Sequence, residues 1–95
     1  MENWASIKLE YTMNDGVVLA RKTRVFVKRE ATSMQLVFAE DCYMPRGARV
    51  ILGAPVSLMY DHRTLVAMPL LCLLEEDKGE WYVLKEELVT LERIQ

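Results

Sequence analysis

Alternation of apolar and polar side chains is the dominant pattern along this chain. Residues 6–12 place three apolar side chains on one face and two charged ones on the other, which is the period of a half-buried strand. An Asn-Asp-Gly turn at residues 14–16 precedes a β-branched run that starts at Val17. The pattern predicts a hairpin between residues 6–12 and the strand that begins at Val17.

The remaining segments also have the length and period of short strands. We expect them at residues 17–29 with a bend near Arg21, and at residues 34–39, 48–52, 56–60, 64–74 and 81–84. Residues 40–47 and 61–63 carry the Gly, Pro and Asp of loops and turns. Leucines spaced by four and three suit a short amphipathic helix within residues 84–95, and the alternative is a final strand at residues 88–94, where apolar and polar residues also alternate. The whole predicts an all-β fold, a small antiparallel barrel of six or seven strands.

Composition limits the classes of function. The chain has 95 residues, 52% of them apolar, and a net charge of −2, so we expect one domain over residues 1–95 and no nucleic-acid partner. Its longest apolar run, residues 65–74, is too short to span a membrane and contains Pro69. Two isolated cysteines and the lack of a signal-peptide pattern indicate a cytoplasmic protein.

No combination of side chains points to catalysis or to a bound metal or cofactor. His62 is the only imidazole and lies in an Asp-His-Arg turn, without a nucleophile spaced to use it. Cys42 and Cys72 would leave a zinc site with His62 short of a fourth ligand. The acidic residues within 75–80 lack the alternating spacing of a calcium loop. We therefore expect a protein that is not an enzyme.

One segment permits a sharper hypothesis. Residues 21–29 contain five basic side chains around Phe26. Because side chains alternate between the two faces of a strand, we expect this ring to point outward with the basic side chains. Arginine forks bind phosphate oxygens and an aromatic ring can stack on a base. The candidate ligand-binding residues are Arg21, Arg24, Phe26, Lys28 and Arg49. The competing interpretation is an exposed strand that basic side chains guard against aggregation.

Aromatic residues near strand and loop ends predict an interface with a protein partner or a second copy of the chain. The candidates are Trp4, Phe26, Tyr43 and Trp81. Such rings are common anchors where two proteins meet. The alternative is that the two tryptophans pack across the open ends of the chain's own barrel.

One further pattern consists of Met34, Leu36 and Phe38 in one strand, Pro45, Arg46 and Gly47 in the next turn, and Val50 and Leu52 in the strand after it. Through these positions, residues 21–94 resemble a PilZ domain, a small β-barrel module that binds cyclic di-GMP. The family's ligand motifs, Arg-x-x-x-Arg and Asp/Asn-x-Ser-x-x-Gly, are both missing. Arg21 and Arg24 are one residue too close, and Lys28, Glu30 and Ser33 occupy the three turn positions.

The resemblance therefore implies a degenerate member that has kept the barrel and lost the nucleotide site. We expect a non-enzymatic regulatory module that acts through protein contacts and does not bind cyclic di-GMP. The alternative is a small-ligand sensor that binds a cyclic dinucleotide or another phosphate through residues 21–29.

Overall fold

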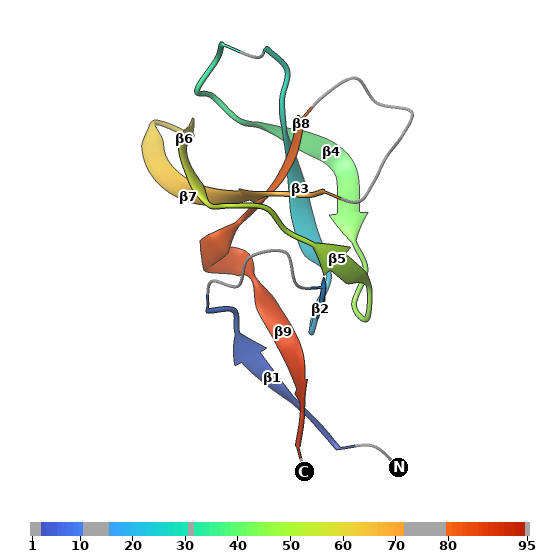
Figure 1. The fold of residues 1–95 in the computed structure, drawn as a ribbon. Helices are drawn as coiled ribbons and strands as arrows, with labels where there is room; N and C mark the ends of the chain where they lie inside the picture. Colours follow the sequence, from blue (N-terminus) through green and yellow to red (C-terminus); the bar gives the residue numbers. More distant parts are fainter. Residues whose placement is uncertain (1–2, 11–15, 31, 72–79, 95) are drawn as a thin grey trace.

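The computed structural model describes residues 3–10, 16–30, 32–71 and 80–94. Within them the chain forms nine short strands and one 3₁₀ turn (Figure 1). They are β1 (Trp4–Lys8), β2 (Gly16–Val18), β3 (Thr23–Lys28), β4 (Val37–Met44), β5 (Arg49–Ile51), β6 (Val56–Tyr60), β7 (Arg63–Pro69), β8 (Glu80–Leu84), η1 (Lys85–Glu87) and β9 (Val89–Arg93). The prediction of a β-rich antiparallel fold is confirmed, with more strands than expected.

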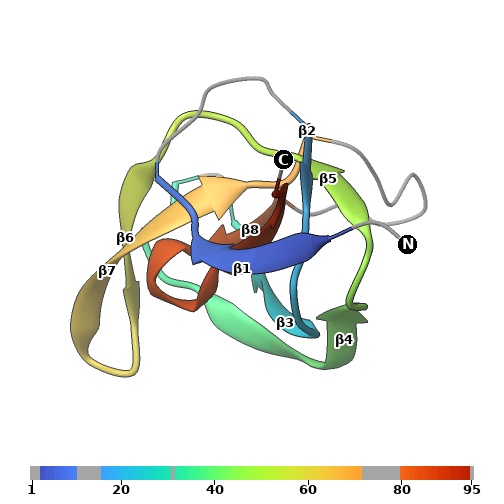
Figure 2. The same cartoon turned by 90° about the horizontal axis from the view of Figure 1, so that it is seen from below.

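The strands form one five-stranded sheet and two ribbons. The sheet has the order β4-β3-β8-β7-β6, and β2 pairs with β5 while β1 pairs with β9. Figures 1 and 2 show the β1·β9 ribbon on one side of the body. In the described part of the chain β4 and β6 are the edges of the sheet, and only an isolated bridge between Gln35 and Met59 links the segment before β4 to β6. The architecture is therefore a sheet with two ribbons, without a ladder that closes it into a barrel.

The central strands of the sheet are buried on both faces. On β7 and β8, Met68 and Val83 face one core, while their neighbours Ala67 and Leu84 face another, because successive strand residues point to opposite sides. The first core contains Leu9, Leu19, Val50, Leu52, Met68, Val83 and Leu88. The second contains Phe26, Leu36, Leu58, Ala67, Tyr82 and Leu84. The ribbons therefore pack on one face, and the curled edges of the sheet cover the other.

The predicted N-terminal hairpin is wrong. β1 pairs with β9 from Trp4 opposite Arg93 to Lys8 opposite Val89, and β2 pairs with β5. Residues 11–15, which include most of the predicted turn, lie outside the described residues. Both N-terminal strands thus pair with strands distant in sequence, which local turn chemistry does not encode.

Phe26 does not point outward. Its side chain is 0% exposed and belongs to the second core. β3 lies between β4 and β8, and a register shift in its pairing with β4 falls between Arg24 and Phe26. The ring is buried because this face of the sheet is covered, while the basic side chains of β3 on the same face keep their charged ends nearer to solvent.

Residues 40–44 are part of a strand, which corrects the predicted loop. Pairing passes from Arg24 opposite Tyr43 to Phe26 opposite Phe38, so β4 has more residues than β3 in this interval. Asp41 has a positive φ of 63° there, as expected where a strand bulges. The predicted strand at residues 34–39 accordingly begins late, at Val37.

One prediction in the C-terminal half is confirmed, and one open alternative is decided against the helix. Asp61 and His62 form the two-residue turn between β6 and β7, both with positive φ, which is the type I′ geometry of tight hairpins. Of the two alternatives for residues 84–95, the strand is correct, since β9 follows a three-residue η1. No helix among the described residues is long and apolar enough to cross a membrane.

Leu36 tests the second core. Its side chain is 2% exposed, so Leu36→Ala should lower the free energy of unfolding by about 2 to 5 kcal/mol through lost burial and a residual cavity. The neighbouring Val37, which is exposed, provides the control, and Val37→Ala should cost less than about 1 kcal/mol. Urea denaturation measures both, and equal costs would contradict this assignment of the core.

Candidate functional site

An ion pair between Arg24 and Glu87 joins the middle of the sheet to η1. The Nε of Arg24 donates a hydrogen bond to Oε2 of Glu87 at 2.8 Å, and a terminal guanidinium nitrogen lies 2.8 Å from the same oxygen. The Arg24 side chain is 39% exposed and that of Glu87 is 21% exposed. The hydrogen bond to Glu87 is the main cause that raises the pKa of Arg24 above its usual value.

Arg21 binds the same residue through its backbone. Its Nη2 donates to the carbonyl oxygen of Glu87 at 2.9 Å. Two of the predicted ligand-binding arginines thus converge, and Glu87 is the point on which they converge. The Glu87 carboxylate thus occupies the Arg24 guanidinium, and the Glu87 backbone carbonyl accepts a hydrogen bond from Arg21, so both donors that a phosphate would need are engaged.

Arg24 also lies over a cluster of aromatic rings. Its Cζ is 5.2 Å from the centroid of Phe26 and 5.6 Å from that of Phe38. Phe26 makes an edge-to-face contact with Phe38 at 5.6 Å and with Tyr60 at 4.8 Å. Guanidinium groups are attracted to ring faces at such distances, so the rings and Glu87 together fix the position of Arg24.

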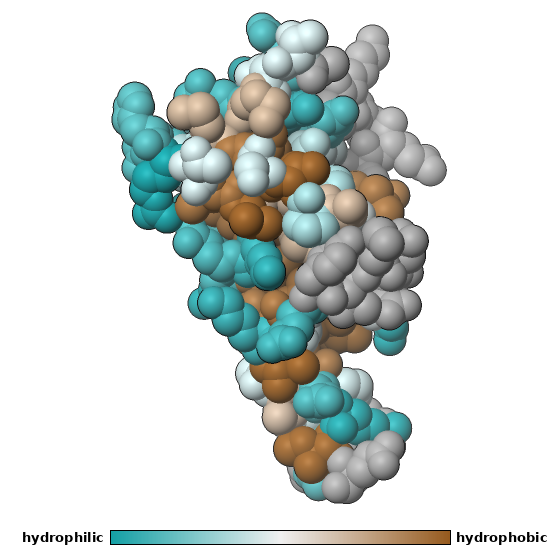
Figure 3. Space-filling model, turned by 60° about the vertical axis from the view of Figure 1, so that its left-hand side comes forward, coloured by the Kyte–Doolittle hydropathy of each residue, from teal (hydrophilic) through white to brown (hydrophobic). Residues whose placement is uncertain are grey.

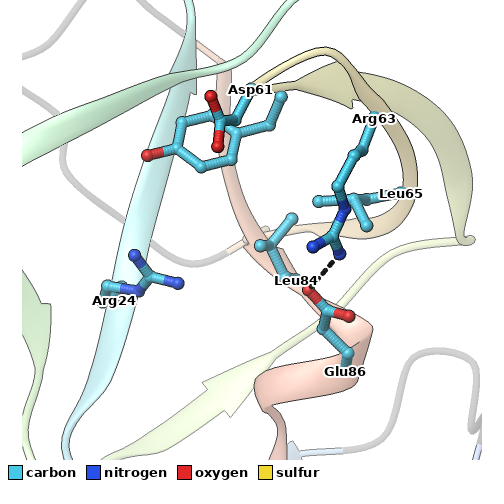
Figure 4. A pocket seen from close by; sticks show the side chains of 7 residues that line it. Arg24, Asp61, Arg63, Leu65, Leu84 and Glu86 are labelled. Carbon is cyan, nitrogen blue, oxygen red and sulfur yellow. Dashed lines mark hydrogen bonds and ion pairs between the residues drawn. The ribbon is translucent and has the colours of Figure 1, made fainter.

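A pocket of about 250 Å³ opens beside Arg24 (Figure 4). It is lined by Arg24, Tyr60, Asp61, Arg63, Leu65, Leu84 and Glu86. The type I′ turn places Asp61 on one wall, and on another wall Nη2 of Arg63 binds Oε1 of Glu86 at 3.4 Å. Both arginines therefore already face a carboxylate, which disfavours an added anion in this pocket.

The remaining basic candidates lie elsewhere. Nζ of Lys28 lies 3.0 Å from Oε2 of Glu80, which also accepts a hydrogen bond from the hydroxyl of Tyr82 at 2.8 Å. Arg49 is on β5, beside Gly16 of β2. The five predicted ligand-binding residues therefore separate into the Glu87 site, the Glu80 site, the buried Phe26 and the ribbon β2·β5.

The Glu80 site shifts two pKa values in opposite directions. The hydrogen bond from Tyr82, with Lys28 as the second cause, lowers the pKa of Glu80. Burial and the hydrogen bond to Glu80 raise the pKa of Tyr82 to about 12. The shared proton of the phenol therefore stays on Tyr82, where it stabilises the carboxylate.

The four predicted interface aromatics lie on four different strands. Trp4 is 44% exposed on β1, and Tyr43 is exposed on β4 beneath Nζ of Lys22, which lies 4.3 Å from its ring centroid. Trp81 is half-buried on β8, where its Nε1 is buried without a hydrogen-bond partner among the described residues. Phe26 contributes to the core instead.

Side chains for acid–base or metal chemistry are dispersed in the described ranges. His62 is exposed in its turn and Cys42 is a free thiol on β4. No group of three or more His, Cys, Asp or Glu residues within those ranges could hold a metal ion. The sequence interpretation missed Glu87, whose signal was a Lys-Glu-Glu step between two apolar segments that resembled a helix.

Glu87→Gln should lower the free energy of unfolding by about 1 to 2 kcal/mol, because it removes the charge that balances a partly buried Arg24. Glu86→Gln is the matched control, since its pair with Arg63 is longer and more exposed, and should cost less than about 0.5 kcal/mol. Urea denaturation at neutral pH measures both. If the two variants lost the same stability, the Arg24–Glu87 pair would not anchor η1.

Tyr82 should make the protein sensitive to alkali. A tyrosine ionises near its ordinary pKa of 10 in the unfolded chain and at about 12 in the fold, so the unfolded state loses its proton first and stability falls as the pH rises through this window. At pH 11 the loss is about 1 kcal/mol relative to pH 8. Tyr82→Phe should not show this component, and an unchanged difference between the two pH values in that variant would refute the assignment.

Comparisons of the chain with protein-family models, with curated proteins and with solved structures find no match. The function therefore rests on the geometry of the chain itself.

Proposed function

We propose that this protein is a non-enzymatic interaction or regulatory module that acts by binding another protein chain. The observation that carries this proposal is the β1·β9 ribbon, which projects from the body as an arm (Figure 1). The molecule measures 46 Å along its longest axis against 27 and 23 Å across. A lone two-stranded ribbon is marginally stable in water, so this arm gains from being covered.

The body covers only the root of the arm. Leu9, Leu88 and Thr90 are buried there. Toward the tip, Trp4 is exposed on one face of the ribbon and Ile94 (54%) on the other. On the same face as Ile94, Ile7 (39% exposed) is still partly uncovered opposite Thr90. Apolar side chains that emerge on both faces of a projecting ribbon are typical of a segment that another chain covers.

A shallow groove continues this apolar surface onto the body. It has a volume of about 270 Å³ and is lined by Lys8, Thr64, Leu65, Val66, Lys85 and Glu86. Figure 3 shows apolar residues exposed both on the body and on the arm below it. Since Lys8 ends β1, the groove lies at the root of the arm.

The regulatory role in this proposal, and its PilZ-like type, follow from the PilZ resemblance of the sequence. The bridge between Gln35 and Met59 brings the two edges of the large sheet toward each other, which is compatible with a barrel-like ancestor. The phosphate-sensor alternative has one supporting feature, the convergence of Arg21 and Arg24. A phosphate could bind Arg24 only after the ion pair between Arg24 and Glu87 had broken. Because breaking this ion pair costs free energy, we favour the interaction module over the sensor.

The arm can be tested by photo-crosslinking in the cells that produce the protein. A photoreactive phenylalanine at Ile7 or Ile94 should form covalent adducts with a protein chain, because these positions lie on the exposed arm. The same residue at His62, exposed on the opposite hairpin, is the control and should form few. An absence of arm-specific adducts at both positions would refute the interaction module.

A further inference from the structure

We propose that the partner of the arm is a second copy of this chain, which pairs its own β1 with the outer edge of β1. The two ribbons would form one four-stranded sheet in the order β9-β1-β1′-β9′, where the prime marks the second copy. This inference rests on the proposed function and specifies its partner. A two-fold symmetric contact of this kind is closed and self-limiting.

The outer edge of β1 has its backbone groups directed away from β9. Asn3 accepts a hydrogen bond from the backbone N–H of Ile94, and Leu9 donates one to Leu88. Because inward and outward positions alternate in an antiparallel ladder, Ser6 and Lys8 direct their N–H and C=O groups outward. In the described part of the chain β9 is the only strand that pairs with β1.

The sequence of β1 is complementary to itself about Ser6. A two-fold axis there makes Ser6 and Ser6′ a hydrogen-bonded pair and places Trp4 opposite Lys8′ and Ala5 opposite Ile7′. On one face each tryptophan meets a lysine, which is a favourable cation–π pair, and on the other each isoleucine covers an alanine. Within Trp4–Lys8 no like charges oppose each other, as a contact between two copies requires.

In this register Trp4′ of the second copy also reaches the groove at the root of the arm. Trp4′ lies opposite Lys8 on the same face, and Lys8 lines the groove beside Val66 and Lys85. The exposed indole of the second copy is thereby placed at a surface of apolar side chains and a lysine stem. An aromatic anchor in a pocket at the centre of an interface commonly carries much of its binding energy.

The other edges of the described structure are less suited to strand addition. Residues 34–36 already line β6, through hydrogen bonds from Met59 to Met34 and from Leu36 to Met59. β4 bulges at Asp41 and carries acidic side chains, and bulges and charges protect edges from pairing. At its root β9 is occupied by Ala20, which donates to Val89. Compared with these three edges, β1 has an uninterrupted register and is mostly apolar.

Ser6→Pro tests the backbone pairing. Proline removes the outward N–H of Ser6 and leaves the ladder to β9 intact, while Ser6→Val keeps the N–H and serves as the control. Light scattering after size exclusion at about 100 µM chain, a concentration suited to a small interface, should give twice 11.0 kDa for the wild type and Ser6→Val, and a monomer for Ser6→Pro. A monomeric wild type, or a dimeric Ser6→Pro with unchanged circular dichroism, would overturn the proposal.

Val66→Glu tests the groove. A carboxylate there should oppose docking of Trp4′ and weaken dimerisation at least tenfold, whereas Met59→Glu, an equally exposed apolar position outside the groove, should leave it unchanged. Equal effects of the two variants would exclude the groove from the interface.

Cysteine cross-linking tests the register without relying on a destabilising variant. In a Cys42→Ser, Cys72→Ser background, Ser6→Cys places two cysteines about 5.5 Å apart between Cα atoms, within the range of a disulfide. Ala5→Cys places them about 7 to 8 Å apart, beyond that range. Mild oxidation should therefore yield a dimer band for the first variant and little for the second, and the reverse result would refute the register.

The failure of this inference is distinguishable from that of the proposed function. A monomeric wild type whose arm positions still form adducts with a different protein would refute the homodimer and keep the interaction module. A monomer without arm-specific adducts would refute both.

Discussion

Burial of the large sheet on both of its faces is the constraint on which the rest of this structure depends. Met68 and Ala67 on β7, like Val83 and Leu84 on β8, serve different cores although they are adjacent in sequence. A chain of 95 residues has few elements with which to cover two faces. The ribbon β2·β5 and the roots of β1 and β9 are used for one face, and the curled edges of the sheet for the other. The outer part of the β1·β9 ribbon is consequently left without cover.

The same constraint explains the basic strand. β3 is an internal strand of the sheet, where a cationic side chain loses part of its hydration, and each such side chain therefore needs a partner from the chain itself. Glu87 supplies one for Arg24, and Glu80 supplies one for Lys28. A cluster of cations that resembles a phosphate site in the sequence is thus used to join strands and to hold η1 against the sheet.

The sequence predicted what local chemistry determines. The strand at residues 56–60 and its Asp-His turn were found correctly because a type I′ hairpin is encoded by a few adjacent residues. The pairing of β1 with β9 was not found, because it joins the two ends of the chain. Phe26 was assigned to the wrong environment since alternation separates the two faces of a strand but does not reveal that both are covered. Glu87 was missed because its role depends on Arg24, 63 residues away.

The arm also differs from the other edges in how it is protected against pairing with another chain, and this difference does not follow from burial. β6 is lined by the segment before β4, and β4 itself bulges at Asp41, so two exposed edges are protected against pairing with other chains. β1 has neither protection, and its single charge, Lys8, is placed where a two-fold related Trp4 would meet it. The contrast between these two protected edges and the unprotected β1 supports our proposal that β1 binds another chain. In so small a domain, pairing this edge with a second copy would also extend the two-stranded ribbon to four strands, and a sheet of three or more strands with an apolar face can be stable by itself.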